Sequence, residues 1–203
     1  MAVTFADDAL GSPPPAPPAR PRVLLVGTGF ALVGIVLSFA GLFGIYVEHR
    51  AQVINSGQTW LPKEVSIDLT PFNFALVGLA ISVVIMQWAL YCVKHEDRPR
   101  AYLALGLTAL LGAAYINGIC FAYTQMGFTV HDTSGVGILV YAITGLHLAM
   151  VGAGIIFIGL MAFRTLGGQY SAQDREGLQA AALYWYVTAA VYTVIWYAIF
   201  VTK

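Results

Sequence analysis

The stretch SGVGILVYAITGLHLAMVGAGIIFIGLMAF, residues 134–163, decides the fold. It contains no charged side chain, and its most polar group is the imidazole of His147 near the middle. A helix of about 20 residues crosses the roughly 30 Å hydrocarbon core of a bilayer. The stretch is therefore predicted to be a transmembrane helix that carries a histidine inside the bilayer.

Four more apolar stretches of this kind occur in the chain, at residues 22–47, 72–94, 101–124 and 179–201. The 203 residues are 59% hydrophobic and 10% charged, which is far more apolar than a soluble domain. Barrel strands would be short segments of alternating polarity, so these long runs exclude a β-barrel. The sequence predicts an all-α, polytopic membrane protein built as a five-helix bundle.

The beginning of the chain, residues 1–21, has a different composition. It holds six of the nine prolines and the adjacent Asp7 and Asp8, and it lacks the basic stretch and short apolar core of a signal peptide. This composition predicts a disordered, Pro-rich arm, with docking to a partner as the alternative interpretation. We divide the chain into this arm, 1–21, and a membrane domain, 22–203.

The basic residues near the helix ends predict the orientation. With the N-terminus in the cytoplasm, the inner side carries seven of the ten Lys and Arg residues, and the outer side carries Arg50, Lys63 and Lys203. Positive charge accumulates on the cytoplasmic side of membrane proteins. We therefore expect the N-terminus and the arm inside and the C-terminus outside.

The predicted spans contain few groups that could carry chemistry. All Asp and Glu residues, together with His49, His95 and His131, fall in tails, loops or helix ends. Haem and copper sites need several ligands at one depth, which His147 lacks, so we assign no catalytic and no metal-binding residue. We expect His147 to be a structural hydrogen-bond partner, with proton transfer as the alternative.

Two amides lie deep in other spans, Gln87 and Asn117. We expect both to form interhelical hydrogen bonds, each worth on the order of 1 kcal/mol.

Small residues recur every four positions in the decisive stretch, at Gly145, Ala149 and Ala153. Such a strip lets two helices approach closely within a membrane, where van der Waals packing replaces the missing hydrophobic drive. The strip is predicted to be a helix-packing surface.

The last span, AAALYWYVTAAVYTVIWYAIF at residues 180–200, is rich in aromatic residues. Tyr184, Trp185, Tyr192 and Trp196 extend through its middle, whereas an interfacial belt would place aromatic side chains at the ends. We expect these four side chains to pack or to face a partner.

The order of several motifs resembles subunit III of the haem-copper respiratory oxidases over nearly all of the chain after the arm. The motifs are FAGLFGIY at 39–46 followed by EHRAQ, GICFAYTQMGFTV at 118–130, TGLH at 144–147 and GLQAAALYW at 177–185. The five-helix form and the HRAQ and QTWLPKE segments are similar to the actinobacterial cytochrome c branch of that family.

The resemblance implies a non-redox subunit of a terminal oxidase, of the cytochrome c oxidase type, that stabilises the catalytic subunit I during aerobic electron transport. It also implies a bacterial cell membrane, haem and copper in partner subunits rather than in this chain, bound phospholipid, and no nucleic acid. The oxidase reaction would belong to the complex, and this chain would have no catalytic centre.

Departures from the family pattern keep an alternative open. Hydrophobic or neutral residues replace the family's acids and histidines at Ile35, Ala122, Met150, Gln179, Tyr186 and Ala189. The alternative is a paralogous accessory or assembly subunit of another complex, such as a quinol oxidase or a nitric oxide reductase. A small transporter is disfavoured because the spans lack acids.

Overall fold

The computed structural model describes residues 22–61, 65, 67–127, 135–167 and 175–202, and in this part of the chain the regular structure is helical throughout. The helices are α1 (Val23–Asn55), α2 (Thr70–Lys94), α3 (Arg98–Gln125), α4 (Val136–Leu166) and α5 (Glu176–Ile195), the last continuing as a π-helical turn, η2 (Trp196–Val201). All five, with η2 counted in α5, are long and apolar enough to cross a membrane. The prediction of a five-helix membrane bundle is confirmed.

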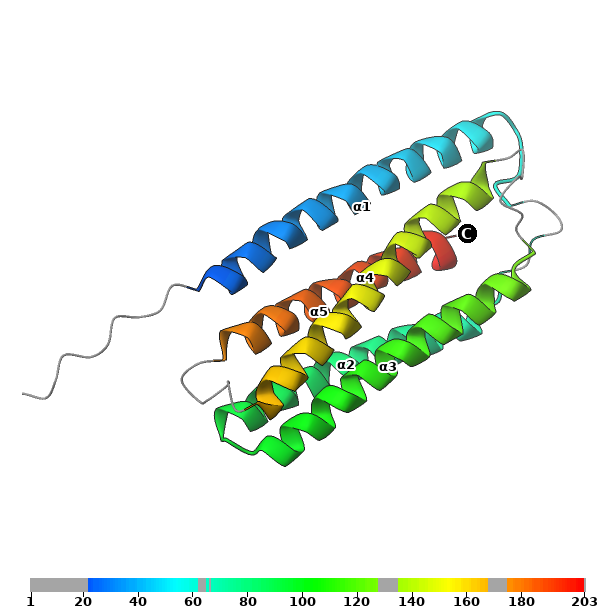
Figure 1. The fold of residues 1–203 in the computed structure, drawn as a ribbon. Coiled ribbons are helices and arrows are strands. Elements are labelled where there is room, and N and C mark those ends of the chain that lie inside the picture. The colour runs from blue at the N-terminus through cyan, green and yellow to red at the C-terminus, as the bar shows by residue number, and fades with distance from the viewer. Residues whose placement is uncertain (1–21, 62–64, 66, 128–134, 168–174, 203) are drawn as a thin grey trace, which may run out of the picture.

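The helices lie roughly side by side, with α1 on one flank, the α2–α3 hairpin on the other, and α4 and α5 between them (Figure 1). Helix α5 packs against α1, α2 and α4, and α2 packs most extensively against α3. Helix α5 is therefore the central helix of the bundle.

Helix α1 is longer than predicted. The apolar run was expected to end at residue 47, but the helix continues to Asn55 and shortens the connection to α2. An apolar run shows which part of a helix lies in the hydrocarbon layer, but not where the helix ends. The polar helical turns beyond Val47 therefore could not be recognised from hydropathy. Arg50 in these turns donates from Nη1 to Thr202 Oγ1 at 2.8 Å and from Nη2 to the Thr202 carbonyl.

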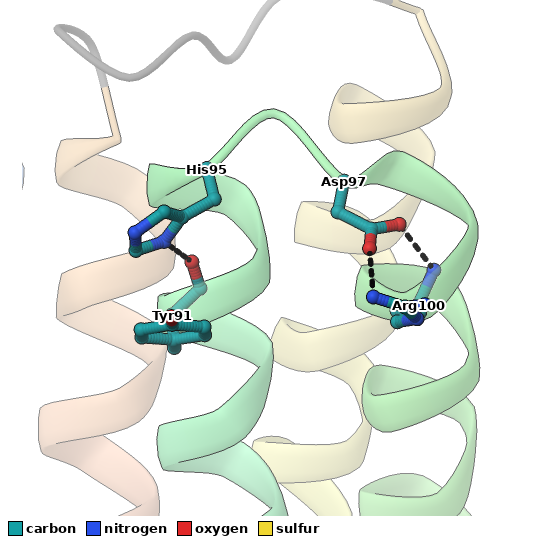
Figure 2. A network of polar contacts seen from close by, with 4 residues as sticks. All are labelled: Tyr91, His95, Asp97 and Arg100. Atoms are coloured by element: carbon teal, nitrogen blue, oxygen red, sulfur yellow. Dashed lines mark hydrogen bonds and ion pairs between the residues drawn. The ribbon is translucent and has the colours of Figure 1, made fainter.

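A tight turn joins α2 to α3 (Figure 2). Its backbone passes through Glu96 in the left-handed region, with φ of 59°. Asp97 then caps α3, because its Oδ1 accepts from the Arg100 amide at 3.3 Å and its Oδ2 lies 2.9 Å from Arg100 Nη1. His95 Nδ1 donates to the Tyr91 carbonyl at 2.9 Å, so a side chain bonds one backbone group at each of the two helix ends of this turn.

The core is built around Trp185 of α5, which is fully buried. Its ring lies against Gly112 of α3 and Gly154 of α4, where an added Cβ would come within 2.6 Å and 2.9 Å of ring atoms. Its Nε1 donates to Ser82 Oγ of α2 at 2.9 Å. One indole therefore fixes the spacing of four helices.

The predicted packing strip on α4 does not take this role. Ala149 and Ala153 are exposed, and a Cβ on Gly145 would meet open space. A four-residue spacing defines a helix face but not the direction in which that face points, and this one points away from the other described helices. The close approaches instead occur at Gly112 and Gly154.

Candidate functional site

His147 is completely buried in the interior of α4 and hydrogen-bonded at both ring nitrogens. Nε2 lies 2.9 Å from the Thr188 carbonyl of α5, and Nδ1 lies 2.8 Å from the Tyr115 hydroxyl of α3. A carbonyl oxygen can only accept, so Nε2 carries the proton. Nδ1 of the neutral imidazole then accepts from Tyr115, and both groups are satisfied.

Aromatic rings surround this histidine. The Tyr115 and Tyr192 rings lie 5.4 Å from the imidazole between centroids, and the Phe39 ring of α1 lies at 6.3 Å. The Tyr192 hydroxyl donates to the Phe72 carbonyl of α2 at 3.1 Å. We call Phe39, Phe72, Tyr115, His147, Thr188 and Tyr192 the His147 cluster, and its members come from all five helices.

The aromatic residues of α5 pack within the chain. These side chains were expected either to pack within the chain or to face a partner. Trp185 and Tyr192 are fully buried, so both pack within the chain. The Tyr184 hydroxyl donates to the Met150 carbonyl at 3.0 Å, and Trp196 Nε1 donates to Asn73 Oδ1 at 2.8 Å. These rings occupy the middle of a span because α5 itself occupies the middle of the bundle.

The two amides differ in their surroundings. Gln87 Oε1 accepts from the Tyr186 hydroxyl at 2.6 Å, which gives the interhelical bond expected for it, here between α2 and α5. Asn117 lies on the exposed face of α3, and among the described residues none hydrogen-bonds its side chain. The bond expected for Asn117 is therefore not formed within this part of the chain.

Sequence reasoning missed the partners of His147. Tyr115 and Thr188 are 32 and 41 residues away, so no local pattern connects them to the histidine. The sequence did contain one signal for the Tyr115 contact, which is the depth of the two residues in the membrane. Tyr115 lies about four residues past the middle of α3, and His147 about four before the middle of the antiparallel α4, which puts both at one level.

The cluster is suited to holding helices together rather than to holding a metal. Both nitrogens of His147 already have partners, so neither presents a free lone pair. Within the described ranges, no group of three or more His, Cys, Asp or Glu side chains could form a metal site. What the arrangement does is join α3, α4 and α5 through directional bonds in an apolar interior.

Five membrane-spanning helices fastened by a buried, uncharged polar cluster define a polytopic α-helical membrane protein. The sequence model of the cytochrome c oxidase subunit III family matches residues 20–203, so the chain belongs to that family.

Curated relatives agree with this assignment. The chain is 28% identical over 176 residues to cytochrome c oxidase subunit 3 of Prototheca wickerhamii, covering 85% of this chain and 64% of that protein. The match to the Strongylocentrotus purpuratus protein is 28% over 165 residues, covering 80% and 63%, and that to the Petromyzon marinus protein is 29% over 174 residues, covering 83% and 66%. The chain thus spans somewhat less than two thirds of these relatives.

Proposed function

We propose that this chain is a supporting, non-redox subunit of a respiratory terminal oxidase of the cytochrome c oxidase type, in a bacterial cell membrane. Family membership and the names of the relatives support attachment to such a complex. The haem and copper of the reaction would then be held by partner subunits, above all the catalytic subunit I. The contribution of this chain is to stabilise that subunit in the membrane.

Family membership carries the assignment to an oxidase, and the state of His147 supports the non-redox, structural part of the proposal. His147 is the one basic side chain near the middle of a span among the described residues, and both of its nitrogens are occupied within the protein. A histidine bound in this way gives rigidity, since breaking either bond would leave a buried polar group unsatisfied. Rigidity is what a supporting subunit needs.

The test is purification of the affinity-tagged chain from native membranes in mild detergent, followed by a visible spectrum of the whole preparation. We expect haem a absorption, a catalytic subunit I in stoichiometric amount, and oxygen consumption with reduced cytochrome c. A preparation that contains b-type haem alone and reduces nitric oxide, or that oxidises quinol instead, would contradict the proposal and favour a paralogous subunit.

A second measurement addresses the chain itself. After the chain is separated from its partners, metal analysis is expected to find iron and copper well below one per chain. Stoichiometric iron or copper in the separated chain would overturn the non-redox role, whatever the complex contains.

A further inference from the structure

A cleft of about 400 Å³ lies between the last turns of α1 and the first turn of α4. Both elements are at the end of the bundle opposite the α2–α3 turn (Figure 1). The volume falls in the range of ligand sites in proteins, about 300–1,000 Å³. We call it the α1–α4 cleft, and most of its lining comes from six residues: Ile45, Glu48, His49, Gln52, Ile138 and Leu139.

The lining of the α1–α4 cleft changes from apolar to polar along the helices. Ile45, Ile138 and Leu139 are aliphatic, whereas Glu48 and Gln52 lie about one and two turns further along α1 and are polar. The apolar run of α1 ends at residue 47, so this change falls where the hydrocarbon layer meets the lipid headgroups. The cleft therefore offers an apolar surface inside the bilayer and hydrogen-bonding groups at the bilayer surface.

Aromatic contacts hold the α1 wall of the cleft in place. The His49 ring lies 5.8 Å from the Trp60 ring between centroids, and Trp60 lies 5.3 Å from the buried Tyr46. On the α4 side, a Cβ at Gly135 would come within 3.2 Å of His49 Nε2, and the φ of Gly135, 71°, also favours glycine. Trp and Tyr are enriched at membrane interfaces, so the aromatic residues independently place the cleft at the headgroup level.

Glu48 gives the polar end of the cleft a negative charge. Within the described part of the chain, no Lys or Arg pairs with its carboxylate, which accepts one hydrogen bond, from Gln52 Nε2 at 3.3 Å. Arg50, two residues further on, bonds Thr202 instead. A carboxylate at this level complements a cation, and the Gln52 amide keeps a second hydrogen for an anionic group.

We propose that the α1–α4 cleft binds one phospholipid whose headgroup carries a primary amine, of the phosphatidylethanolamine type. The ammonium donates to the Glu48 carboxylate, and the phosphate accepts from the Gln52 amide. An acyl chain lies against Ile45, Ile138 and Leu139. A choline headgroup has no N–H to donate, so the site discriminates between the two headgroups.

The expectation of bound phospholipid thereby gains a place and a headgroup chemistry. The inference does not rest on the proposed function, because residues of this chain alone line the cleft. The competing occupant is a lysine of another subunit, which has an ammonium and an aliphatic stem but no phosphate for the Gln52 amide. Lipid is favoured because the lining changes polarity at the same depth as the bilayer does.

The first experiment uses the tagged complex, purified in mild detergent and reconstituted into bilayers that contain a photoreactive phospholipid. The lipid is phosphatidylethanolamine or phosphatidylcholine, with the same acyl chains and a diazirine in one of them. Labelled peptides are measured by mass spectrometry relative to the face of α2 around Val84, which is 69% exposed and lies outside the cleft.

We expect phosphatidylethanolamine to label the peptides around Ile45 and Ile138 about threefold to fivefold more than phosphatidylcholine does, as suits hydrogen bonds to a partly exposed carboxylate. Equal labelling by the two lipids would overturn the proposal. Absence of label from both peptides would also overturn it, because another subunit would then occupy the cleft.

The second experiment compares Glu48→Gln with Asp68→Asn in the same assay. Glu48→Gln removes the charge from the cleft and keeps the size of the side chain, so the preference for phosphatidylethanolamine should disappear. Asp68→Asn removes a negative charge from the same end of the bundle, outside the cleft, and keeps an acceptor for Thr70. With this control the preference should stay at the wild-type value. Equal loss in both variants would indicate only an effect of surface charge, and an unchanged preference in Glu48→Gln would show that Glu48 does not bind the headgroup; either result would overturn the proposal.

Discussion

One ring nitrogen of His147 donates a hydrogen bond and the other accepts one, and this difference decides which substitutions the position tolerates. Nε2 must donate to the Thr188 carbonyl and Nδ1 must accept from the Tyr115 hydroxyl. A replacement that offers a donor and an acceptor can keep at least part of this arrangement, and one that offers neither cannot. A proton carrier would instead require a group that titrates.

The first prediction compares His147→Gln with His147→Leu in the native complex. Gln has a donor and an acceptor, so we expect the complex to assemble and to consume oxygen like wild type. Leu leaves the Tyr115 hydroxyl and the Thr188 carbonyl without this partner, at a cost of about 1–2 kcal/mol, and the subunit should be lost on detergent extraction. Subunit retention and oxygen consumption are measured together. Full assembly of the Gln variant with most of its turnover lost would show that the histidine carries protons.

The second prediction concerns the contact between Gly112 and Trp185. A Cβ at Gly112 would lie 2.6 Å from the indole Cη2, and the fully buried ring cannot move aside without shifting its neighbours. We expect Gly112→Ala to destabilise the purified chain by about 1–3 kcal/mol, seen as a lower midpoint of thermal unfolding in detergent. The control is Gly118→Ala on the same helix, where a Cβ would meet open space. Equal midpoints for the two variants would contradict this account of the core.

Among the elements, α1 depends on α5 and η2 at both of its ends. It buries three side chains, Leu32, Phe39 and Tyr46, which recur every seven residues along one narrow face. Polar contacts supplement this modest packing. Glu176 Oε1 at the start of α5 accepts from the Leu25 amide at 2.9 Å, and Arg50 near the other end of α1 holds Thr202 after η2.

The third prediction follows from the contact at Glu176. No side-chain cap comes from Arg22, the residue before α1, so the carboxylate of α5 both satisfies an N-terminal amide and complements the positive end of the helix dipole. We expect Glu176→Ala to fray the first turn of α1, with hydrogen exchange at residues 23–26 about fivefold faster. Glu176→Gln keeps an acceptor oxygen but loses the charge, so its exchange rate at these residues should lie between that of the wild type and that of the Ala variant. Unchanged exchange in the Ala variant would mean that packing alone holds this helix end.

The sequence was sufficient for the number, order and approximate limits of the helices, because about 20 apolar residues are needed wherever a chain crosses the bilayer. It was not sufficient for what each helix face contacts. The spacing of a packing strip occurs at Gly145, Ala149 and Ala153, yet these residues point outward. Trp185 was a candidate for contact with a partner, yet it lies at the centre of the core. Which face turns inward depends on the positions of four other helices, and no local pattern contains that information.

At the scale of the whole molecule, the odd number of spans puts the two ends of the membrane domain on opposite faces. The start of α1 and the end of η2 lie at opposite ends of the bundle (Figure 1). The α2–α3 turn, with Lys94, Arg98 and Arg100, lies at the end where α1 starts. Basic residues are retained on the cytoplasmic side, so this end is predicted to face the cytoplasm.

The fourth prediction tests that orientation with alkaline phosphatase, which becomes active only after export from the cytoplasm. Fused after Lys203, the enzyme should be active, and fused at Glu96 in the α2–α3 turn, it should be inactive. Because truncation at Glu96 removes three helices, a sandwich fusion that keeps the rest of the chain is the matched control, and it should also be inactive. The basic residues supply the physical reason, since each Lys or Arg costs several kcal/mol to move across the hydrocarbon core. The reverse pattern, with activity at Glu96 and none after Lys203, would place the α2–α3 turn outside and overturn the charge argument while leaving the bundle itself intact.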